Sequence, residues 1–155
     1  MEIRRFKVGE ESEIWTLFYE TVHKVNAKDY TRQQIEAWAP SAQLPKRWIQ
    51  RLKQKKPFVA LFEGRIIGFA ELENDGHIDC FYCAHDFQRK GVGKALFSKI
   101  EQEASQMGIS KLFTEASITA VEFFKSRGFE MSGKQIVEYN GEKFTNYAMY
   151  KYVNR

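Results

Sequence analysis

One short segment constrains the fold of this chain more than any other: Arg89-Lys90-Gly91-Val92-Gly93-Lys94, which is basic and contains two glycines. It follows a predicted strand at 77–83 and opens a helix with the apolar stripe Val92, Leu96, Ile100, Ala104 and Met107. Glycines let a ligand approach the backbone closely, and the first N–H groups of a helix have no intrahelical acceptor. Together with the helix dipole and the cationic side chains, the segment predicts a diphosphate site.

Two other phosphate-binding motifs fit this segment poorly. A P-loop ends in Gly-Lys-Ser/Thr, whereas Ala95 follows Gly93-Lys94 here. A Rossmann fingerprint has the form Gly-x-Gly-x-x-Gly, but Leu96 stands at its last place and an antiparallel meander precedes it. A glycine-rich turn without a ligand remains the structural alternative.

Hydrophobic periodicity predicts the order β, two or three helices, three β, α, β, α, β, β. The predicted strands lie at 3–8, 58–62, 66–72, 77–83, 111–116, 129–139 and 143–152, with helices near 14–25, 31–39, 45–55, 92–107 and 119–127. The strands on either side of the 92–107 helix are expected to be parallel neighbours, so the sheet is mixed and the fold is α/β (α+β). We expect the strand at 77–83 to be central and buried on both faces.

Length and composition indicate a single globular domain spanning residues 1–155, with 43% hydrophobic residues. No apolar run approaches the ~20 residues of a membrane span, and the first residues do not resemble a signal peptide. The expectation is therefore a cytoplasmic protein without a membrane partner. The net charge of +4 suits an anionic ligand.

The densest basic stretch, from Lys46 to Lys56, has two interpretations. It is either a nucleic-acid patch or the solvated face of a helix whose apolar side is Trp48, Ile49 and Leu52. Because no nucleic-acid motif accompanies the charge, the second interpretation is favoured and no nucleic-acid partner is expected.

The two cysteines, Cys80 and Cys83, have the spacing of a redox or metal motif. However, residues three apart on a strand point to opposite faces, and a structural zinc site usually has four ligands. His77 and His85 are the nearby residues that could complete such a site. We expect two buried, reduced cysteines and no metal.

Two sequence blocks resemble the GNAT N-acetyltransferase superfamily. The block from Phe81 to Gly93 resembles the family's acetyl-CoA motif, an apolar strand end followed by Gln/Arg-x-x-Gly-x-Gly/Ala. The block from Ser117 to Phe129 resembles the family segment Asn-x-x-Ala-x-x-Phe-Tyr-x-x-x-Gly-Phe. The residues at 37–39 and 115–120 further resemble those of a small bacterial branch of the family, the YafP-like proteins. The resemblance covers essentially the whole chain and implies a GNAT-like fold, mostly antiparallel with a splayed parallel pair flanked by helices.

The resemblance also implies acetyl-CoA as cosubstrate. The main-chain amides of 88–94 would hold its diphosphate, the backbone of Phe81 and Cys83 would pair with the pantetheine arm, and the Cys83 N–H would polarise the thioester. Lys94 or Lys125 would reach a nucleotide phosphate. The cofactor-binding residues implied are Phe81, Tyr82, Cys83, Gln88, Arg89, Lys90, Gly91, Val92, Gly93, Lys94, Ser117 and Phe124.

Acyl transfer to an amine requires an unprotonated amine and a donor for the developing oxyanion. Asp79 is the candidate base or water anchor, since a carboxylate in a predicted buried strand is costly without a partner or a task. His77, two residues earlier, is the second candidate. The resemblance reveals one departure, because Phe124 stands where the family often has a tyrosine acid. Candidate substitutes are Tyr82, Tyr139 and Tyr147, and Ser117 replaces the family's usual asparagine.

The acceptor pocket is expected between the N-terminal helices and the last hairpin, with His23, Tyr30 and Trp38 as lining residues. Core packing is the alternative role for Tyr30 and Trp38. The leading hypothesis is transfer of acetyl from acetyl-CoA to a primary amine of a small molecule or protein. A non-catalytic acyl-CoA sensor or scaffold is the alternative, and a homodimer fits an enzyme of this size.

Overall fold

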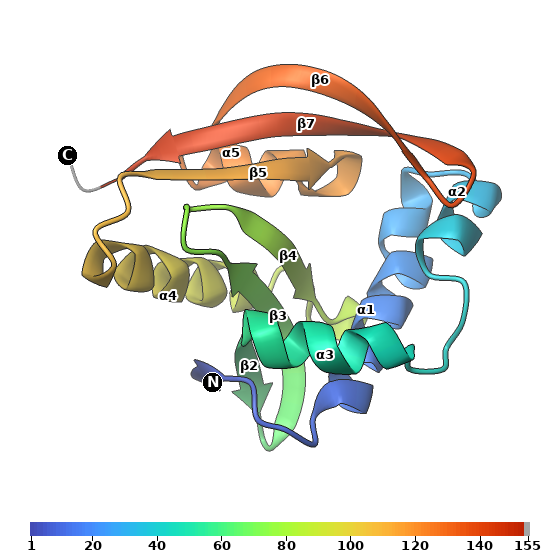
Figure 1. Ribbon diagram of the computed structural model, residues 1–155, viewed down its shortest axis with the longest axis horizontal. Helices are drawn as coiled ribbons and strands as arrows, with labels where there is room; N and C mark the ends of the chain where they lie inside the picture. The colour runs from blue at the N-terminus through green and yellow to red at the C-terminus, as the bar shows by residue number, and fades with distance from the viewer. Residues whose placement is uncertain (154–155) are drawn as a thin grey trace.

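The computed structural model describes residues 1–153, which form two β-sheets with helices around them (Figure 1). The first sheet has the order β1-β2-β3-β4, from β1 (Glu2–Arg5), β2 (Phe58–Phe62), β3 (Arg65–Leu72) and β4 (Ile78–Cys83). The second has the order β5-β7-β6, from β5 (Lys111–Ser117), β6 (Glu130–Tyr139) and β7 (Glu142–Tyr152). All ladders within the two sheets are antiparallel, which confirms the predicted meander and terminal hairpin.

The two sheets meet where β4 begins, at the single parallel bridge between His77 and Phe113. Beyond this bridge β4 and β5 diverge, so the expected parallel pair is present only at its first residue (Figure 1). The expectation that β4 is central and buried on both faces is therefore wrong. It is an edge strand of the first sheet, and its last residues, Phe81 to Cys83, are only half-buried.

A β-bulge in β4 accounts for part of this divergence. Ile78 pairs with Leu72 and Phe81 pairs with Ala70, so Asp79 and Cys80 together face the one residue between them on β3, Glu71. A bulge of this kind bends its strand and re-aims side chains. The strict alternation assumed from the sequence therefore fails at Asp79.

Helices cover both faces of the first sheet. Phe69 of β3 packs on Trp48, with ring centroids 6.3 Å apart, so one face carries α1 (Glu11–Lys24) and α3 (Lys46–Lys55). The neighbouring Gly68 lies under Val92 of α4 (Val92–Gln106), which covers the other face. The remaining helical segments are η1 (Asn26–Lys28), α2 (Arg32–Trp38), η2 (His85–Phe87), η3 (Ile118–Ala120) and α5 (Val121–Ser126).

Local signals place several of these boundaries. Thr31 and Gln34 form the predicted capping box, and α2 ends at Trp38, before Pro40. Asn140 and Gly141 have φ angles of +48° and +81°, the backbone of a type I′ hairpin turn. In the described residues no helix is both long enough and apolar enough to cross a membrane.

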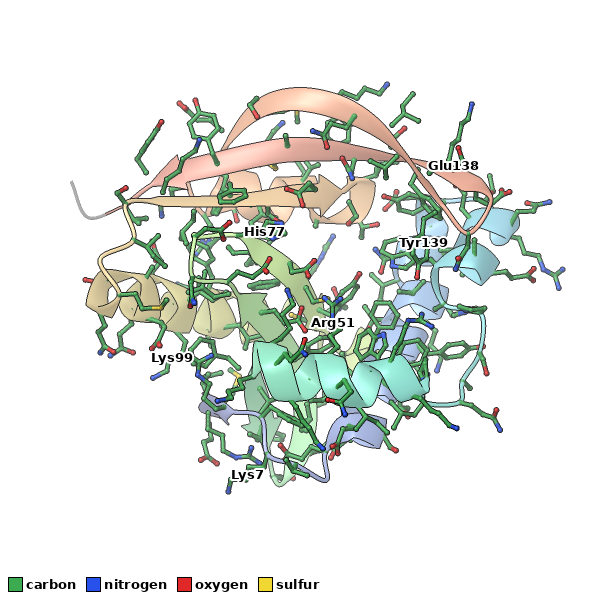
Figure 2. The ribbon with its side chains drawn as sticks, in the orientation of Figure 1. Lys7, Arg51, His77, Lys99, Glu138 and Tyr139 are labelled. Carbon is green, nitrogen blue, oxygen red and sulfur yellow. The ribbon has the colours of Figure 1, made fainter. Side chains whose placement is uncertain are left out.

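Helix α3 departs from the simple amphipathic interpretation of the basic stretch. Trp48 and Leu52 are buried as expected. Arg51, which was assigned to the solvated face, instead turns inward toward β3 and β4, and Figure 2 shows it between α3 and the sheets.

Candidate active site

A cleft of about 1070 Å³ lies between the diverging strands β4 and β5 and continues between the N-terminal helices and the β6–β7 hairpin. Most of the predicted site residues line it: Tyr30, Trp38, Asp79, Phe81, Tyr82, Cys83, Gln88, Arg89, Gly91, Val92, Gly93, Lys94, Ser117 and Phe124. Five predicted residues lie outside the lining: His23, His77, Lys90, Lys125 and Tyr147. Most of the predicted site residues thus lie around one cleft, and their roles stay predictions.

The loop before α4 has the open backbone geometry of an anion site. Arg89 and Gly91 have φ angles of +59° and +84°. The side-chain amide of Gln88 donates to the carbonyl oxygens of Cys83 at 2.8 Å and Ala84 at 3.2 Å, which fixes the loop onto the end of β4. A Cβ added at Gly91 would meet open space, so the head of α4 has room for a phosphate group beside its free N–H groups.

Gly93 has a different reason to be glycine. A Cβ there would lie 2.9 Å from the Phe123 ring and 3.6 Å from the Cys83 sulfur. A side chain at Gly93 would therefore clash with α5. The sequence had suggested that both glycines are needed so that a phosphate can approach the backbone.

The cations of the loop point in different directions. Lys94 lines the cleft, whereas the Lys90 amino group lies 5.2 Å from the centroid of the Phe87 ring. Arg65 covers the same ring at 5.3 Å and is itself held by Asp86 through two 2.8 Å hydrogen bonds. Lys90 therefore contributes charge near the loop without facing the cleft.

The edge strand β4 presents its last three residues to the cleft. Phe81 packs on Phe123 and Phe124 of α5, while Tyr82 turns to the other side and meets the edge of Phe18. The hydroxyl of Thr21 donates to the Cys83 carbonyl at 3.1 Å, which ties this end of the strand to α1. Burial raises the pKa of the Tyr82 hydroxyl well above its usual range, so this group stays protonated.

Cys80 and Cys83 are both free thiols. Cys80 is buried, but Cys83 is only half-buried, contrary to the expectation of two buried cysteines. Burial raises the pKa of Cys83 to about 12 and that of Cys80 well above its usual value, so both stay protonated and poorly nucleophilic.

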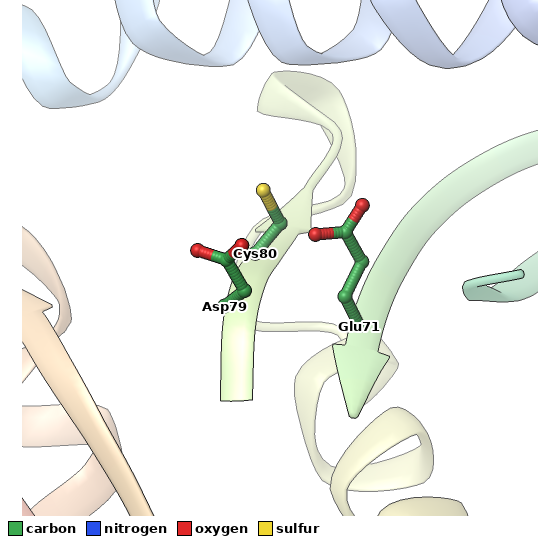
Figure 3. Close-up of side chains that lie close together, drawn as sticks. All are labelled: Glu71, Asp79 and Cys80. Atoms are coloured by element: carbon green, nitrogen blue, oxygen red, sulfur yellow. The ribbon is translucent and has the colours of Figure 1, made fainter. Parts of the chain in front are cut away.

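The β4 bulge brings Glu71, Asp79 and Cys80 together, as Figure 3 shows. Arg51 lies among them, with Nη2 2.6 Å from Glu71, 2.8 Å from Asp79 and 3.2 Å from the Cys80 sulfur. Because the guanidinium donates to all three groups, it takes the place that a metal ion would need. These residues form a partly buried ion-pair cluster and do not fit a metal site.

Asp79 is the best exposed member of this cluster. Its carboxylate is 33% exposed, lines the cleft and also lies 3.5 Å from the Lys55 amino group. Glu71 is fully buried. The structure thus gives Asp79 both a cationic partner and access to bound ligands.

His77 has a different environment from Asp79, although the sequence placed the two on one strand face. Its Nδ1 contacts Glu73, its Nε2 lies 2.7 Å from Glu115 on β5, and its ring stacks on Phe113. Burial alone would lower the pKa of His77, but the two carboxylates outweigh it and the pKa is raised. His77 therefore joins the two sheets at their junction (Figure 2).

Tyr30 and Trp38 form part of the acceptor side of the cleft, with ring centroids 5.2 Å apart. The Tyr30 hydroxyl accepts a 2.8 Å hydrogen bond from the Ile118 N–H. By contrast, the Nε2 of His23 lies 2.7 Å from the Ala39 carbonyl oxygen, so this ring holds α1 to the end of α2.

Comparison with known proteins decides the family. The model of the acetyltransferase (GNAT) domain matches residues 26–151. The chain belongs to the GNAT acetyltransferase family. It is also 30% identical, over 96% of its length and 94% of the relative's, to the N-acetyltransferase YafP of Escherichia coli K12, described as uncharacterized.

Solved GNAT structures have the same fold. A GCN5-related N-acetyltransferase of Rhodopseudomonas palustris superposes with a TM-score of 0.93 at 30% identity, covering 98% of this chain and 95% of that one. The PaiA N-acetyltransferase of Thermoplasma acidophilum, solved with coenzyme A, gives 0.72 at 20% identity, covering 98% of each chain. The mixed, mostly antiparallel GNAT-like fold is thus confirmed.

The second GNAT block has a structural role at each of its altered positions. Phe124 is 2% exposed and packs on Phe81 and Phe129, so it supplies apolar contact where many family members have a tyrosine. The Ser117 oxygen accepts from the Ala120 N–H at 3.2 Å and caps the turn η3. Tyr147 lies on β7, where it pairs with Ala116 of β5, and is not part of the cleft lining.

Three further residues belong to the site region but were not predicted from the sequence: Arg51, Glu71 and Glu115. Glu71 was the available signal, because a carboxylate within the apolar strand Ile66–Leu72 requires a buried cation. Glu115 lies between two buried residues on β5. This alternation predicts that its side chain is exposed, and it gives no signal for a role in the site.

Proposed function

We propose that this protein is an acetyl-CoA-dependent N-acetyltransferase that acts on a primary amine. The observation that carries the proposal is the cleft between β4 and β5, which opens onto the glycine loop at the head of α4. An elongated thioester with a diphosphate fits such a site, because one end offers N–H groups to the phosphates and the other offers a free strand edge.

The chain's own groups would hold the cosubstrate in three places. Main-chain amides of Gln88 to Lys94 would bind the diphosphate, with Lys94 adding a side-chain charge. The edge of β4 at Phe81 and Cys83 would pair with the amides of the pantetheine arm as with an added strand. The Cys83 N–H would then donate to the thioester oxygen, where negative charge develops during attack.

Bound acetyl-CoA would supply the acetyl group as a thioester. The acceptor enters as an ammonium and gives up one proton before its nitrogen bonds to the acyl carbon. As the carbon–sulfur bond breaks, the amine loses a second proton and the sulfur leaves as a thiol after taking one up. The net products are an amide, free thiol and one proton.

We assign the first proton transfer to Asp79, acting through water. Its oxygen is already 2.8 Å from Arg51, so it is better suited to orienting a water molecule than to abstracting a proton directly. For the leaving thiolate, Phe124 has no proton to give. Tyr82 and Tyr139 are the remaining hydroxyls from our candidates that line the cleft, since Tyr147 does not.

The buried Phe124 also favours a second function, an acyl-CoA sensor without turnover. Thermal unfolding with and without acetyl-CoA tests cosubstrate binding, because a ligand at 100 times its Kd stabilises by about 2.7 kcal/mol. Thiol release with a panel of amines then separates enzyme from sensor. Absence of a Tm shift at saturating acetyl-CoA contradicts both functions, and a shift without thiol release for any amine leaves only the sensor.

A further inference from the structure

The acceptor end of the cleft is lined mainly by aromatic side chains and also contains carboxylates. Resting on the proposed function, we infer that the acceptor is a small molecule whose primary amine is carried on a flat aromatic body. Neither a polypeptide nor a polyamine has the required shape and charge. Aromatic side chains in the lining, a hairpin tip tied to α2 and two lining carboxylates support this inference.

Two aromatic clusters line this part of the cleft. One consists of Tyr30, Trp38 and Phe144, with centroid separations of 5.2 to 6.1 Å. The other consists of Phe18, Trp48 and Tyr82, with Phe18 5.0 Å from Tyr82 and 4.9 Å from Trp48. All six side chains line the cleft. Rings held in edge contact with each other leave faces on which a planar ligand stacks.

The tip of the β6–β7 hairpin is tied to α2 at the acceptor end of the cleft. Gln34 donates to the Lys143 carbonyl at 2.7 Å, and Asn140 donates to the Ala37 carbonyl at 2.9 Å. Figure 1 shows the hairpin tip beside α2. A polypeptide acceptor needs room for the residues after its reacting amine, and we infer that the tied hairpin restricts that room.

Two carboxylates lie in the cleft lining near the aromatic clusters. Asp79 and Glu115, with side chains 33% and 43% exposed, can each accept hydrogen bonds from an ammonium group. A second ammonium on the same ligand would have to leave water among apolar rings, which is costly. One positive charge at the edge of a flat apolar body is the chemistry that fits.

The test uses the chain's own fluorescence. Its three tryptophans, Trp15, Trp38 and Trp48, all line the cleft, so acceptor binding is measurable without turnover. Protein saturated with coenzyme A is titrated with 2-phenylethylamine, n-butylamine, spermidine and a hexapeptide with a free N-terminus. We expect a Kd for 2-phenylethylamine about 3- to 10-fold below the other three, since stacking on the rings adds affinity beyond apolar burial. An equal or tighter Kd for n-butylamine, spermidine or the peptide overturns the inference.

Variants locate the binding to the rings. Trp38→Ala should raise the Kd and the KM for 2-phenylethylamine about 10-fold without changing the KM for acetyl-CoA, and Trp38→Phe should restore most of the affinity. Tyr139→Ala, at a cleft position that is 44% exposed, provides a second test that does not threaten folding. Tyr152→Ala, at an aromatic position outside the lining, is the matched control. Unchanged affinity in both Trp38→Ala and Tyr139→Ala also overturns the inference.

Different results would contradict the acetyltransferase function and the aromatic acceptor. If acetyl-CoA gives no Tm shift or no amine releases thiol, the proposed acetyltransferase function fails. If thiol is released but spermidine or the peptide has the highest kcat/KM, the function stands and the aromatic acceptor is wrong.

Discussion

Arg51 reaches the fully buried carboxylate of Glu71, with Nη2 2.6 Å from Oε1 and Nε 3.3 Å from Oε2. Removal of the guanidinium would leave a buried charge without a partner, which typically costs about 3–5 kcal/mol. Arg51→Met should therefore lower the free energy of unfolding by roughly that amount, as measured by urea denaturation.

Two controls accompany this prediction, a double variant and a surface variant. Arg51→Met combined with Glu71→Leu removes both charges and should recover most of the loss. Arg32→Met breaks an exposed pair with Glu36 and should leave the urea midpoint unchanged. A double variant as unstable as the single one would show that the ion pair is not the cause.

Gly91→Asp should abolish the Tm shift produced by acetyl-CoA. The new carboxylate would occupy the open space at the head of α4 and repel the phosphates. Gly64→Asp is a matched control, because Gly64 also has a positive φ, +79°, and open space, but lies in the β2–β3 turn. The control should be strained similarly and keep the full ligand shift. Equal shifts in the two variants would refute the loop assignment.

Asp79→Asn should lower kcat by about 100-fold, at the lower end of general-base contributions. The KM for acetyl-CoA should stay unchanged, because Asp79 lies away from the phosphate loop. Glu10→Gln is the comparison, since Glu10 pairs with Arg4 in a similar way but outside the cleft lining. Normal thiol release by Asp79→Asn would remove this residue from the mechanism.

The pH dependence of stability should depend on His77. Its pKa is raised in the folded state by Glu73 and Glu115 against the effect of burial. The stabilisation is therefore complete below the ordinary histidine pKa of about 6.5 and is lost as pH rises through the higher folded pKa. His77→Gln should reduce the fall of the urea midpoint as the pH rises above about 6.5. A retained slope in His77→Gln would assign it to other groups.

Sequence patterns predicted the elements well because their signals are local. The capping box at Thr31, the Asn140-Gly141 turn and the glycine before α4 each act within a few residues. Their positions follow from backbone chemistry that neighbouring residues determine. The GNAT resemblance added the divergence of β4 and β5, which periodicity does not contain.

Long-range pairing was harder to predict. The bulge at Asp79 depends on the register between β3 and β4, and the inward turn of Arg51 depends on a carboxylate 20 residues later. The sequence pattern of a basic helix face is the same whether one of its cations is exposed to solvent or turned toward the sheet. For the same reason His77 looked like a partner of Asp79, although its ring contacts Glu115 from the other sheet.

The gap between β4 and β5 bears on self-association as well as on ligand binding. Unpaired strand edges commonly recruit other chains and initiate aggregation. Here the edges of β4 and β5 both border the same cleft, so the backbone groups left free for a ligand lie within a concave part of the surface. The split sheet thus keeps hydrogen-bonding capacity in reserve without presenting it to other chains.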